Sequence, residues 1–322
     1  MADLQRIIGE TETENELAAM AENFDLNAYM ESRRQMVEES LTAYLDNYID
    51  GDDNRVMEAI RYSLFAPSKR IRPILCFMAC EAFGGDTRSA IPAACALEMI
   101  HTYSLIHDDL PAMDNDDMRR GQPSCHIKYD EATAILAGDA LLSMAFEILG
   151  NTYTACDALA DAKRWLKVIS ILGRGVGPVG IVDGQIMDLQ SLHKALTLEE
   201  LEELSYLKTA VMMIVPLEIG AALAYANEQD IKRMYDFGKY LGLAFQAVDD
   251  ILDIDEDRAF AESQAGKDSP EVKNTFALLL GKDAAAQLAQ GYTEQALEVL
   301  EDLGPKFDTL RIFTNFLVER KA

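Results

Sequence analysis

Five aspartates lie within the short segment Leu105–Gly121, which reads LIHDDLPAMDNDDMRRG. They are Asp108, Asp109, Asp114, Asp116 and Asp117. Carboxylates this close repel one another, because even one like-charged pair a helix turn apart costs some tenths of a kcal/mol. Positive charge must compensate, so the segment predicts either a site for divalent metal ions or a loop whose charges are screened by water.

A second aspartate cluster stands at Asp249, Asp250 and Asp253, in the sequence FQAVDDILD. A helix would place Asp249 and Asp253 on one face, about 6 Å apart along its axis. Two all-oxygen clusters suit Mg²⁺, which takes one or two protein carboxylates per ion and completes its shell with water and substrate phosphate. The first cluster does not fit a calcium-binding EF-hand, because Arg119 stands where that loop requires glycine.

Both segments resemble the aspartate-rich motifs of the trans-prenyltransferases, the short-chain isoprenyl diphosphate synthases, and are most similar to those of the bacterial farnesyl type. The similarity extends over roughly Arg61 to Phe276, with the motifs in the family's order. It implies a head-to-tail (1'-4) condensation of isopentenyl diphosphate with an allylic diphosphate, either dimethylallyl or geranyl diphosphate. Mg²⁺ is the implied cofactor, with Mn²⁺ as its substitute, and a homodimer is the implied assembly.

By this resemblance, carboxylates and cations share the binding of two diphosphates. The metal ions would be held by Asp108, Asp109, Asp114, Asp249, Asp250 and Asp253. Arg119 would bind the allylic diphosphate and Arg120 the isopentenyl diphosphate. Lys208, Thr209 and Gln246 would hold the allylic diphosphate as well. Lys208 and Arg119, with the aspartates, would then stabilise the charge that develops on the leaving group.

A basic segment precedes the first motif. In this segment, Lys69 and Arg72 lie near one another at a helix start. Free backbone N–H groups at such a start favour anions. Taken alone, the segment fits an ordinary solvated turn as well as an anion site. His101 stands about two helix turns before Asp108, on the same face. The resemblance assigns Lys69, Arg72 and His101 to isopentenyl diphosphate.

A GQxxD pattern places Gln185 and Asp188 three residues apart, so they are neighbours on a helix. The resemblance puts this motif at the cavity, with Gln185 among the substrate-binding residues and Asp188 supporting them.

Three departures from the family's pattern stand out. Pro67-Ser68 replaces two glycines in the loop before Lys69, and Ala210 replaces the glycine that follows Lys208-Thr209. The family has two lysines on the polar segment after the second motif, of which the second matches Lys273. The first falls at Ser263, with Lys267 nearby. Loss of one cationic donor would lower the rate by about 10²–10³.

Tyr103 stands five residues before Asp108, deeper along the same helical pattern. A buried tyrosine is usually a packing residue. In the family, an aromatic residue here, together with the insertion Pro111-Ala112, is typical of the bacterial farnesyl type. The ring would block the tunnel into which the product grows, so the expected product is farnesyl diphosphate.

Several other functions use similar residues. A geranylgeranyl diphosphate synthase of the same family would differ only in product length. A non-catalytic subunit of a heteromeric prenyl synthase would tolerate Ser263 and the altered glycines. A terpene cyclase or head-to-head synthase needs no isopentenyl site, so Lys69, Arg72 and His101 disfavour it. A structural helical protein with acidic patches would not bind diphosphate with Mg²⁺.

The composition sets outer limits on function. The chain has 322 residues, a net charge of -26 and 49% hydrophobic residues. Such negative charge disfavours binding to nucleic acid. No uncharged apolar run of membrane-spanning length occurs, and the N-terminus lacks a signal-peptide pattern. Five cysteines without CxxC spacing read as reduced thiols, so a cytoplasmic location is expected.

Apolar residues recur at helical spacing through most of the chain, while strand-like alternation is nearly absent. Residues 1–25 read as an acidic N-terminal extension and 26–322 as one polyprenyl synthetase domain. Helical patterns run over about 54–65, 70–83, 87–109, 130–149, 156–173, 178–191, 198–226, 228–255, 270–281, 284–302 and 306–320. The expected fold is an all-α, single-domain bundle of the isoprenoid-synthase type around a central apolar cavity.

Overall fold

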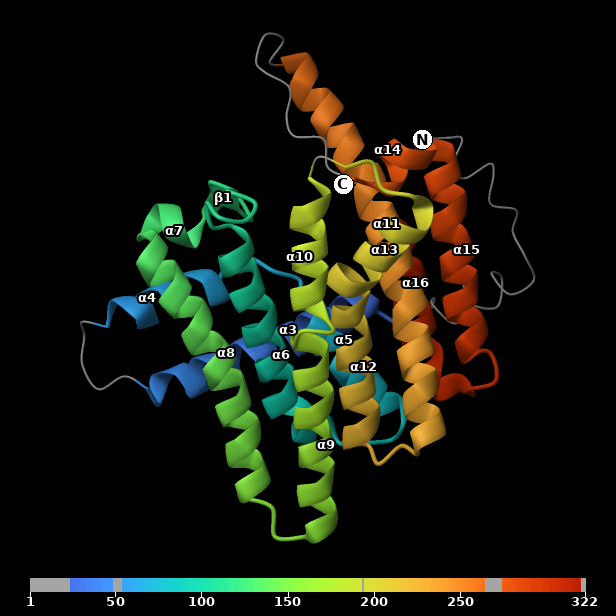
Figure 1. The fold of residues 1–322 in the computed structure, drawn as a ribbon. Coiled ribbons are helices and arrows are strands. Elements are labelled where there is room, and N and C mark those ends of the chain that lie inside the picture. Colours follow the sequence, from blue (N-terminus) through green and yellow to red (C-terminus); the bar gives the residue numbers. More distant parts are fainter. Residues whose placement is uncertain (1–23, 49–53, 193, 264–273, 320–322) are drawn as a thin grey trace.

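The computed structural model describes residues 24–48, 54–192, 194–263 and 274–319 as packed helices and one short hairpin (Figure 1). The longer helices are α3 (Leu26–Asp46), α4 (Arg55–Leu64), α5 (Ile71–Ala82), α6 (Thr87–Asp108), α8 (Glu131–Thr154), α9 (Leu159–Val176), α10 (Ile181–Ser191), α11 (Leu198–Ser205), α12 (Val211–Leu223), α13 (Glu228–Ser263), α15 (Lys282–Leu300) and α16 (Asp308–Glu319). The all-α prediction is confirmed. The N-terminal extension lies almost wholly outside the described residues.

Shorter elements connect these helices. They are the strands β1 (Met118–Arg119) and β2 (Gln122–Pro123), the helices α7 (Cys125–Lys128) and α14 (Phe276–Leu280), the π-helix η1 (Tyr206–Ala210) and the 3₁₀ helix η2 (Pro305–Phe307). The two strands pair antiparallel, with Arg119 opposite Gln122. This hairpin was not predicted, because two-residue strands leave no alternation to read.

Helix α12 lies at the centre of the bundle, and every one of its residues is buried. It packs against α5, α9 and α13, while α6 packs against α5 and α8. A helix that is apolar on all sides must be surrounded by others. The apolar sequence VMMIVPLEIGAAL therefore places α12 inside and leaves the amphipathic helices around it.

The pattern expected as one helix over 198–226 is divided into α11, η1 and α12 by a π-turn. Two glycines bring neighbouring helices close to that turn. A Cβ added to Gly184 of α10 would lie 2.6 Å from the backbone N of Lys208, and one on Gly242 of α13 would lie 2.4 Å from Cα of Ala210. Local periodicity does not report such approaches, so the turn was missed.

Two other boundaries differ from the expectation. Helix α13 runs on to Ser263 instead of ending near residue 255. The helix expected over 270–281 is α14, which begins only at Phe276, after the capping hydroxyl of Thr275 accepts a hydrogen bond from the N–H of Leu278. Its preceding residues to 273 lie outside the described part of the chain.

Among the described residues, three stretches are long and apolar enough to cross a membrane by length and composition alone: Glu131–Thr154, Leu159–Ser191 and Leu198–Leu223. None is an uncharged run, but their mean hydropathy of 1.4 to 1.6 qualifies them. In Leu198–Leu223, 83% of the most apolar window is buried, because it contains the central helix α12. The absence of a membrane segment stays a prediction.

Candidate functional site

The first aspartate motif forms at the C-terminal end of α6. Asp108 is the last helical residue and Asp109 the C-cap, and the N–H of Asp114 returns to the carbonyl of Asp108 at 2.9 Å. Burial raises the pKa of Asp108 to about 6, and the charges of Asp114 and Asp109 add to the effect. The helix dipole also disfavours anions here. The motif is therefore a place where negative charge is costly unless a cation is bound.

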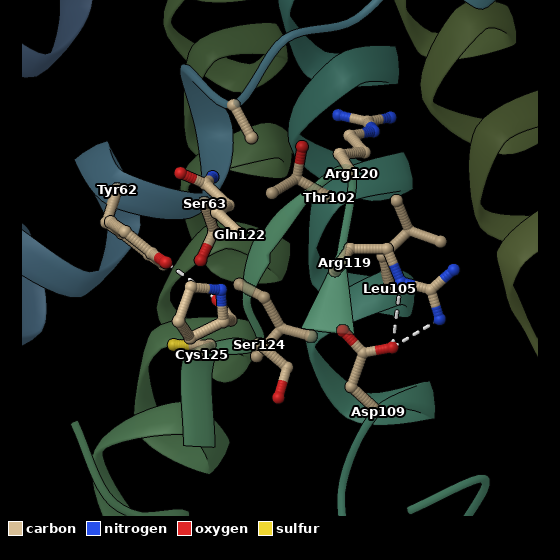
Figure 2. A pocket seen from close by; sticks show the side chains of 13 residues that line it. Tyr62, Ser63, Thr102, Leu105, Asp109, Arg119, Arg120, Gln122, Ser124 and Cys125 are labelled. Atoms are coloured by element: carbon tan, nitrogen blue, oxygen red, sulfur yellow. Dashed lines mark hydrogen bonds and ion pairs between the residues drawn. The ribbon is translucent and has the colours of Figure 1, made fainter. Parts of the chain in front are cut away.

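Arg119 of β1 supplies part of the positive charge that the first motif requires. Its Nε donates to Asp109 Oδ1 at 2.9 Å, its Nη2 contacts the same oxygen, and Nη2 also lies 3.1 Å from Asp116 Oδ2. Figure 2 shows the Arg119 guanidinium turned toward Asp109, while the next side chain, Arg120, extends the other way. The hairpin thus places two adjacent arginines in two different environments.

Lys208 of η1 also lies close to the first motif. Its Nζ donates to Asp188 Oδ2 of α10 at 2.5 Å and lies 3.8 Å from Asp114 Oδ2. Burial lowers the pKa of Lys208, but the charges of Asp188 and Asp114 outweigh that effect and raise it. The ammonium is therefore charged and partly buried beside the carboxylates. Gln185, one turn before Asp188, has a buried amide nitrogen without a hydrogen-bond partner in the described part of the chain.

The second aspartate motif lies on α13 and is linked to η1 by hydrogen bonds. The Thr209 hydroxyl donates to Gln246 Oε1 at 2.6 Å, and Gln246 Nε2 donates to Asp250 Oδ1 at 2.7 Å. The N–H of Phe276 donates to Asp250 Oδ2 at 2.7 Å. Burial raises the pKa of Asp250 to about 6, although these hydrogen bonds oppose the shift. Asp249 and Asp253 flank it on the same helix.

Both motifs are therefore linked to η1, the first through Lys208 and the second through Thr209 and Gln246. In the described part of the chain, no three acidic, histidine or cysteine side chains converge as a ready metal site. The donor set nevertheless fits Mg²⁺, since it consists of hard carboxylate oxygens, and the pKa values of Asp108, Asp109 and Asp250 are raised, which a bound cation would reverse. The metal ions would be held by the six predicted aspartates, of which Asp109 and Asp250 also accept hydrogen bonds from the protein.

A basic cavity of about 490 Å³ lies on the other side of the hairpin. Its lining includes Lys69, Arg72, His101 and Arg120. Arg72 Nη1 and Arg120 Nη2 lie 3.1 and 3.2 Å from His101 Nε2. Burial first, and then the charges of Arg72 and Arg120, hold the pKa of His101 well below its usual value. Because both guanidinium groups can only donate, Nε2 of the neutral ring must accept. The four residues predicted to bind isopentenyl diphosphate thus meet at one cavity.

Tyr103 is buried, with 8% of its surface exposed, and its ring lies edge-on to His107, with 5.8 Å between centroids. Burial raises the pKa of its hydroxyl to about 12, and the charge of Asp108 adds to the effect. The expected position deep on α6 is confirmed. His107 Nε2 lies 3.1 Å from the Ile135 carbonyl of α8, and a Cβ on Gly138 would overlap the imidazole at 2.1 Å.

Other predicted residues cannot be placed. Lys273 and Lys267 lie outside the described residues. Ser263 ends α13, and only its backbone is described. Two buried charged residues, Arg70 and Glu98, were not predicted to belong near the site. The signal for Glu98 was present, because a single glutamate stands in the apolar run AIPAACALEMI and a buried charge requires a partner.

Comparisons with known proteins agree with this geometry. The chain matches the polyprenyl synthetase family over residues 53–303. It is 40% identical to a farnesyl diphosphate synthase of Haemophilus influenzae, covering 89% of this chain and 97% of that protein. It is 42% identical to a geranylgeranyl diphosphate synthase of Cyanophora paradoxa, covering 92% and 97%. An FPP/GFPP synthase from Zymomonas mobilis superposes with a TM-score of 0.79 at 35% identity, covering 91% of this chain and 98% of that one.

Proposed function

The chain belongs to the polyprenyl synthetase family, and from that membership we propose that it condenses isopentenyl diphosphate with dimethylallyl or geranyl diphosphate, head to tail (1'-4). One observation carries the proposal. Adjacent arginines of one hairpin serve two sites, since Arg119 contacts the carboxylates of the first motif and Arg120 contacts His101 in the basic cavity. Two anionic substrates can therefore be held next to each other.

The basic cavity is the site that we assign to isopentenyl diphosphate. Arg72 and Arg120 donate through forked guanidinium groups that match a diphosphate, and Lys69 adds a mobile ammonium. Neutral His101 keeps both guanidinium groups in place without adding a charge. The bound substrate would thus present its double bond toward the allylic site.

The allylic diphosphate is assigned to the space between the two aspartate motifs. Its C1–O bond breaks with the electron pair leaving on diphosphate, and the allylic cation then bonds to C4 of isopentenyl diphosphate. Lys208 and Arg119 stabilise the charge that develops on the leaving oxygens. Mg²⁺, when bound by the aspartates, supplies Lewis-acid stabilisation of that charge. The released diphosphate takes the proton lost from the new chain, so no protein base is needed.

Farnesyl diphosphate is the product that we propose. The support is Tyr103, which is buried on α6, five residues before Asp108, with its ring against His107. Relatives at similar identity are named for both farnesyl and geranylgeranyl products, so the alternative within the family is a geranylgeranyl diphosphate synthase.

We also propose a homodimer in the cytoplasm. Ile127, Ile135 and Leu136 expose 50%, 43% and 54% of their surface on α7 and α8, which gives an apolar face that a second copy could cover. All five cysteines are free, which suits a reducing compartment. Light scattering coupled to gel filtration tests the assembly, and a monomeric mass would contradict it.

The function is tested by incubating the purified chain with geranyl diphosphate, labelled isopentenyl diphosphate and Mg²⁺. Mainly fifteen-carbon product is expected, and mainly twenty-carbon or longer product would favour the geranylgeranyl alternative. No turnover at all would favour a non-catalytic subunit. Product from geranyl diphosphate alone would favour a cyclase or head-to-head synthase.

A further inference from the structure

Arg70 lies between the two basic residues of the cavity loop, yet its own side chain is completely buried. Its backbone is left-handed, with φ 52° and ψ 40°, and it is the N-cap of α5. Residues other than glycine adopt this conformation only where the surroundings hold them in it. The turn that brings Lys69 and Arg72 to the same cavity therefore depends on whatever holds Arg70.

Glu98 of α6 is the closest partner of that buried guanidinium. Arg70 Nη1 donates to Glu98 Oε1 at 2.6 Å, and Nε reaches Glu38 Oε1 of α3 at 3.4 Å. Glu98 is itself 1% exposed. It precedes His101 by three residues, so both lie on one face of α6. One face of α6 thus carries His101, which lines the cavity, and Glu98, which holds the loop residue Arg70.

The pair is not arranged as a strong stabilising ion pair. Arg70 Nη2 and Glu98 Oε2 are buried and have no hydrogen-bond partner among the described residues. A forked arginine–carboxylate contact would have used both. Buried ion pairs also add little to stability compared with apolar replacements. A function in fixing the loop conformation explains the pair better than a function in overall stability.

We propose that Glu98 is a positioning residue for isopentenyl diphosphate: through Arg70 it fixes the left-handed turn that sets Lys69 and Arg72 in the cavity. The inference rests on the proposed function, because that function assigns the cavity to this substrate. Glu98 does not touch the substrate itself, since it is buried and carries the same sign of charge.

The alternative explanation is that the Glu98 carboxylate acts only through its charge. The two explanations predict opposite changes in the affinity for diphosphate. If Glu98 acted only through its charge, Glu98→Gln would remove a repulsion and tighten diphosphate binding. If Glu98 positions the loop, the same change weakens binding. Glu98→Asp is sharper still, because it keeps the charge but shortens the side chain by one methylene, which breaks the 2.6 Å contact with Arg70.

The experiment compares the wild type with E98Q and E98D by titration calorimetry with isopentenyl diphosphate. Glu218→Gln is the matched control, because Glu218 is also a buried glutamate, 5% exposed, and pairs with Arg174 at 2.7 Å outside the proposed site. The KM for geranyl diphosphate is measured in parallel. We expect the Kd of isopentenyl diphosphate to rise about tenfold or more in both Glu98 variants. The KM for geranyl diphosphate should stay within about twofold of the wild type.

An unchanged or lower Kd in E98D would overturn the proposal, and so would an equal loss in E218Q or an equal rise in the KM for geranyl diphosphate. E98Q conserves the shape of the side chain and E98D conserves its charge, so the second variant still tests the proposal if the first does not fold. Failure of the wild type to make product would contradict the proposed function alone, because the Kd comparison does not depend on turnover.

Discussion

Asp250 accepts a hydrogen bond of 2.7 Å from the backbone N–H of Phe276, twenty-six residues further along the chain. Phe276 is fully buried at the start of α14. The contact therefore ties the element after the second aspartate motif to the motif itself. Asp250 also accepts from Gln246, so both of its oxygens are engaged by the protein. These contacts make Asp250 an anchor of the second motif.

Replacement of that anchor should lower stability even without metal or substrate. Asp250→Ala leaves the N–H of Phe276 and the amide of Gln246 without an acceptor, which should reduce the free energy of unfolding by about 1–3 kcal/mol. Urea unfolding of the metal-free protein measures this. Asp302→Ala is the control, because Asp302 is exposed. Equal midpoints for the wild type and Asp250→Ala would show that the contact is unimportant.

Lys208 should contribute to the chemical step, and Asp188 should contribute by holding Lys208. Lys208→Ala removes a cation beside the leaving diphosphate and should lower kcat by about 10²–10³. Asp188→Asn keeps the ammonium but loosens its 2.5 Å contact, so a smaller loss of about 10-fold is expected. Steady-state kinetics measures both. Lys232→Ala, at an exposed lysine paired with Asp236, should leave kcat unchanged.

A larger loss in Asp188→Asn than in Lys208→Ala would contradict this order of roles. It would mean that Asp188 acts on the substrate or the metal directly.

The stability of the metal-free protein should depend on pH through Asp108, whose pKa burial raises from 3.8 to about 6. Because of the raised pKa, the folded state binds this proton more tightly than the unfolded state does. The resulting contribution to the free energy of unfolding is fully present below pH 3.8 and is lost as the pH rises through about 6. Asp108→Asn carries no charge at any pH. Relative to the wild type, it should therefore gain about 2 kcal/mol of unfolding free energy between about pH 4 and pH 8.

Urea unfolding at the two pH values, without metal, measures that difference. Asp302→Asn controls for titration of exposed carboxylates, because Asp302 is exposed. Parallel pH profiles for the wild type and Asp108→Asn would contradict the buried, ionised carboxylate.

Sequence patterns predicted most of the helices, because helices depend on short-range spacing, while the roles of the site residues came from the resemblance to the family and stay predictions. His101 could be assigned to the face of Asp108 since two helix turns separate them, and the structure confirms that it meets Arg72 and Arg120.

Features that depend on tertiary approach could not be predicted. The π-turn that presents Lys208 exists where Gly184 and Gly242 let two helices come close. The link from Glu98 to Arg70 spans two helices, and no local pattern states which buried charges will meet. Spacing along one helix predicts neighbours on that helix, while contacts between helices depend on packing.

His101 should act as a neutral acceptor throughout the working pH range. Since its pKa lies well below 6.5, the KM for isopentenyl diphosphate should show no inflection from this histidine between about pH 6 and pH 8. His101→Phe removes the acceptor shared by Arg72 and Arg120 and should raise that KM about 10-fold or more. The KM for geranyl diphosphate serves as the internal control. A KM that falls as His101 becomes protonated near pH 6 would instead indicate a charged ligand.

Product length should follow the size of the side chain at position 103. Tyr103 is buried on α6 and supported by His107, so Tyr103→Ala removes a ring from the path proposed for the growing chain. We expect the main product to shift from fifteen to twenty carbons or more, because a steric limit is lifted while the diphosphate sites are untouched. Chromatography of the dephosphorylated products measures the shift.

Tyr292→Ala is the matched control for that truncation. Tyr292 is buried to a similar degree, at 7% exposed, but it lies on α15, packs against Leu243 and Ala244 of α13, and donates a hydrogen bond to Glu202 of α11. A cavity there should lower stability without lengthening the product. If both variants lengthened it, general loosening of the bundle would be the cause. If neither did, the length limit would lie with residues other than Tyr103, because a truncation at the limiting position must admit a longer chain.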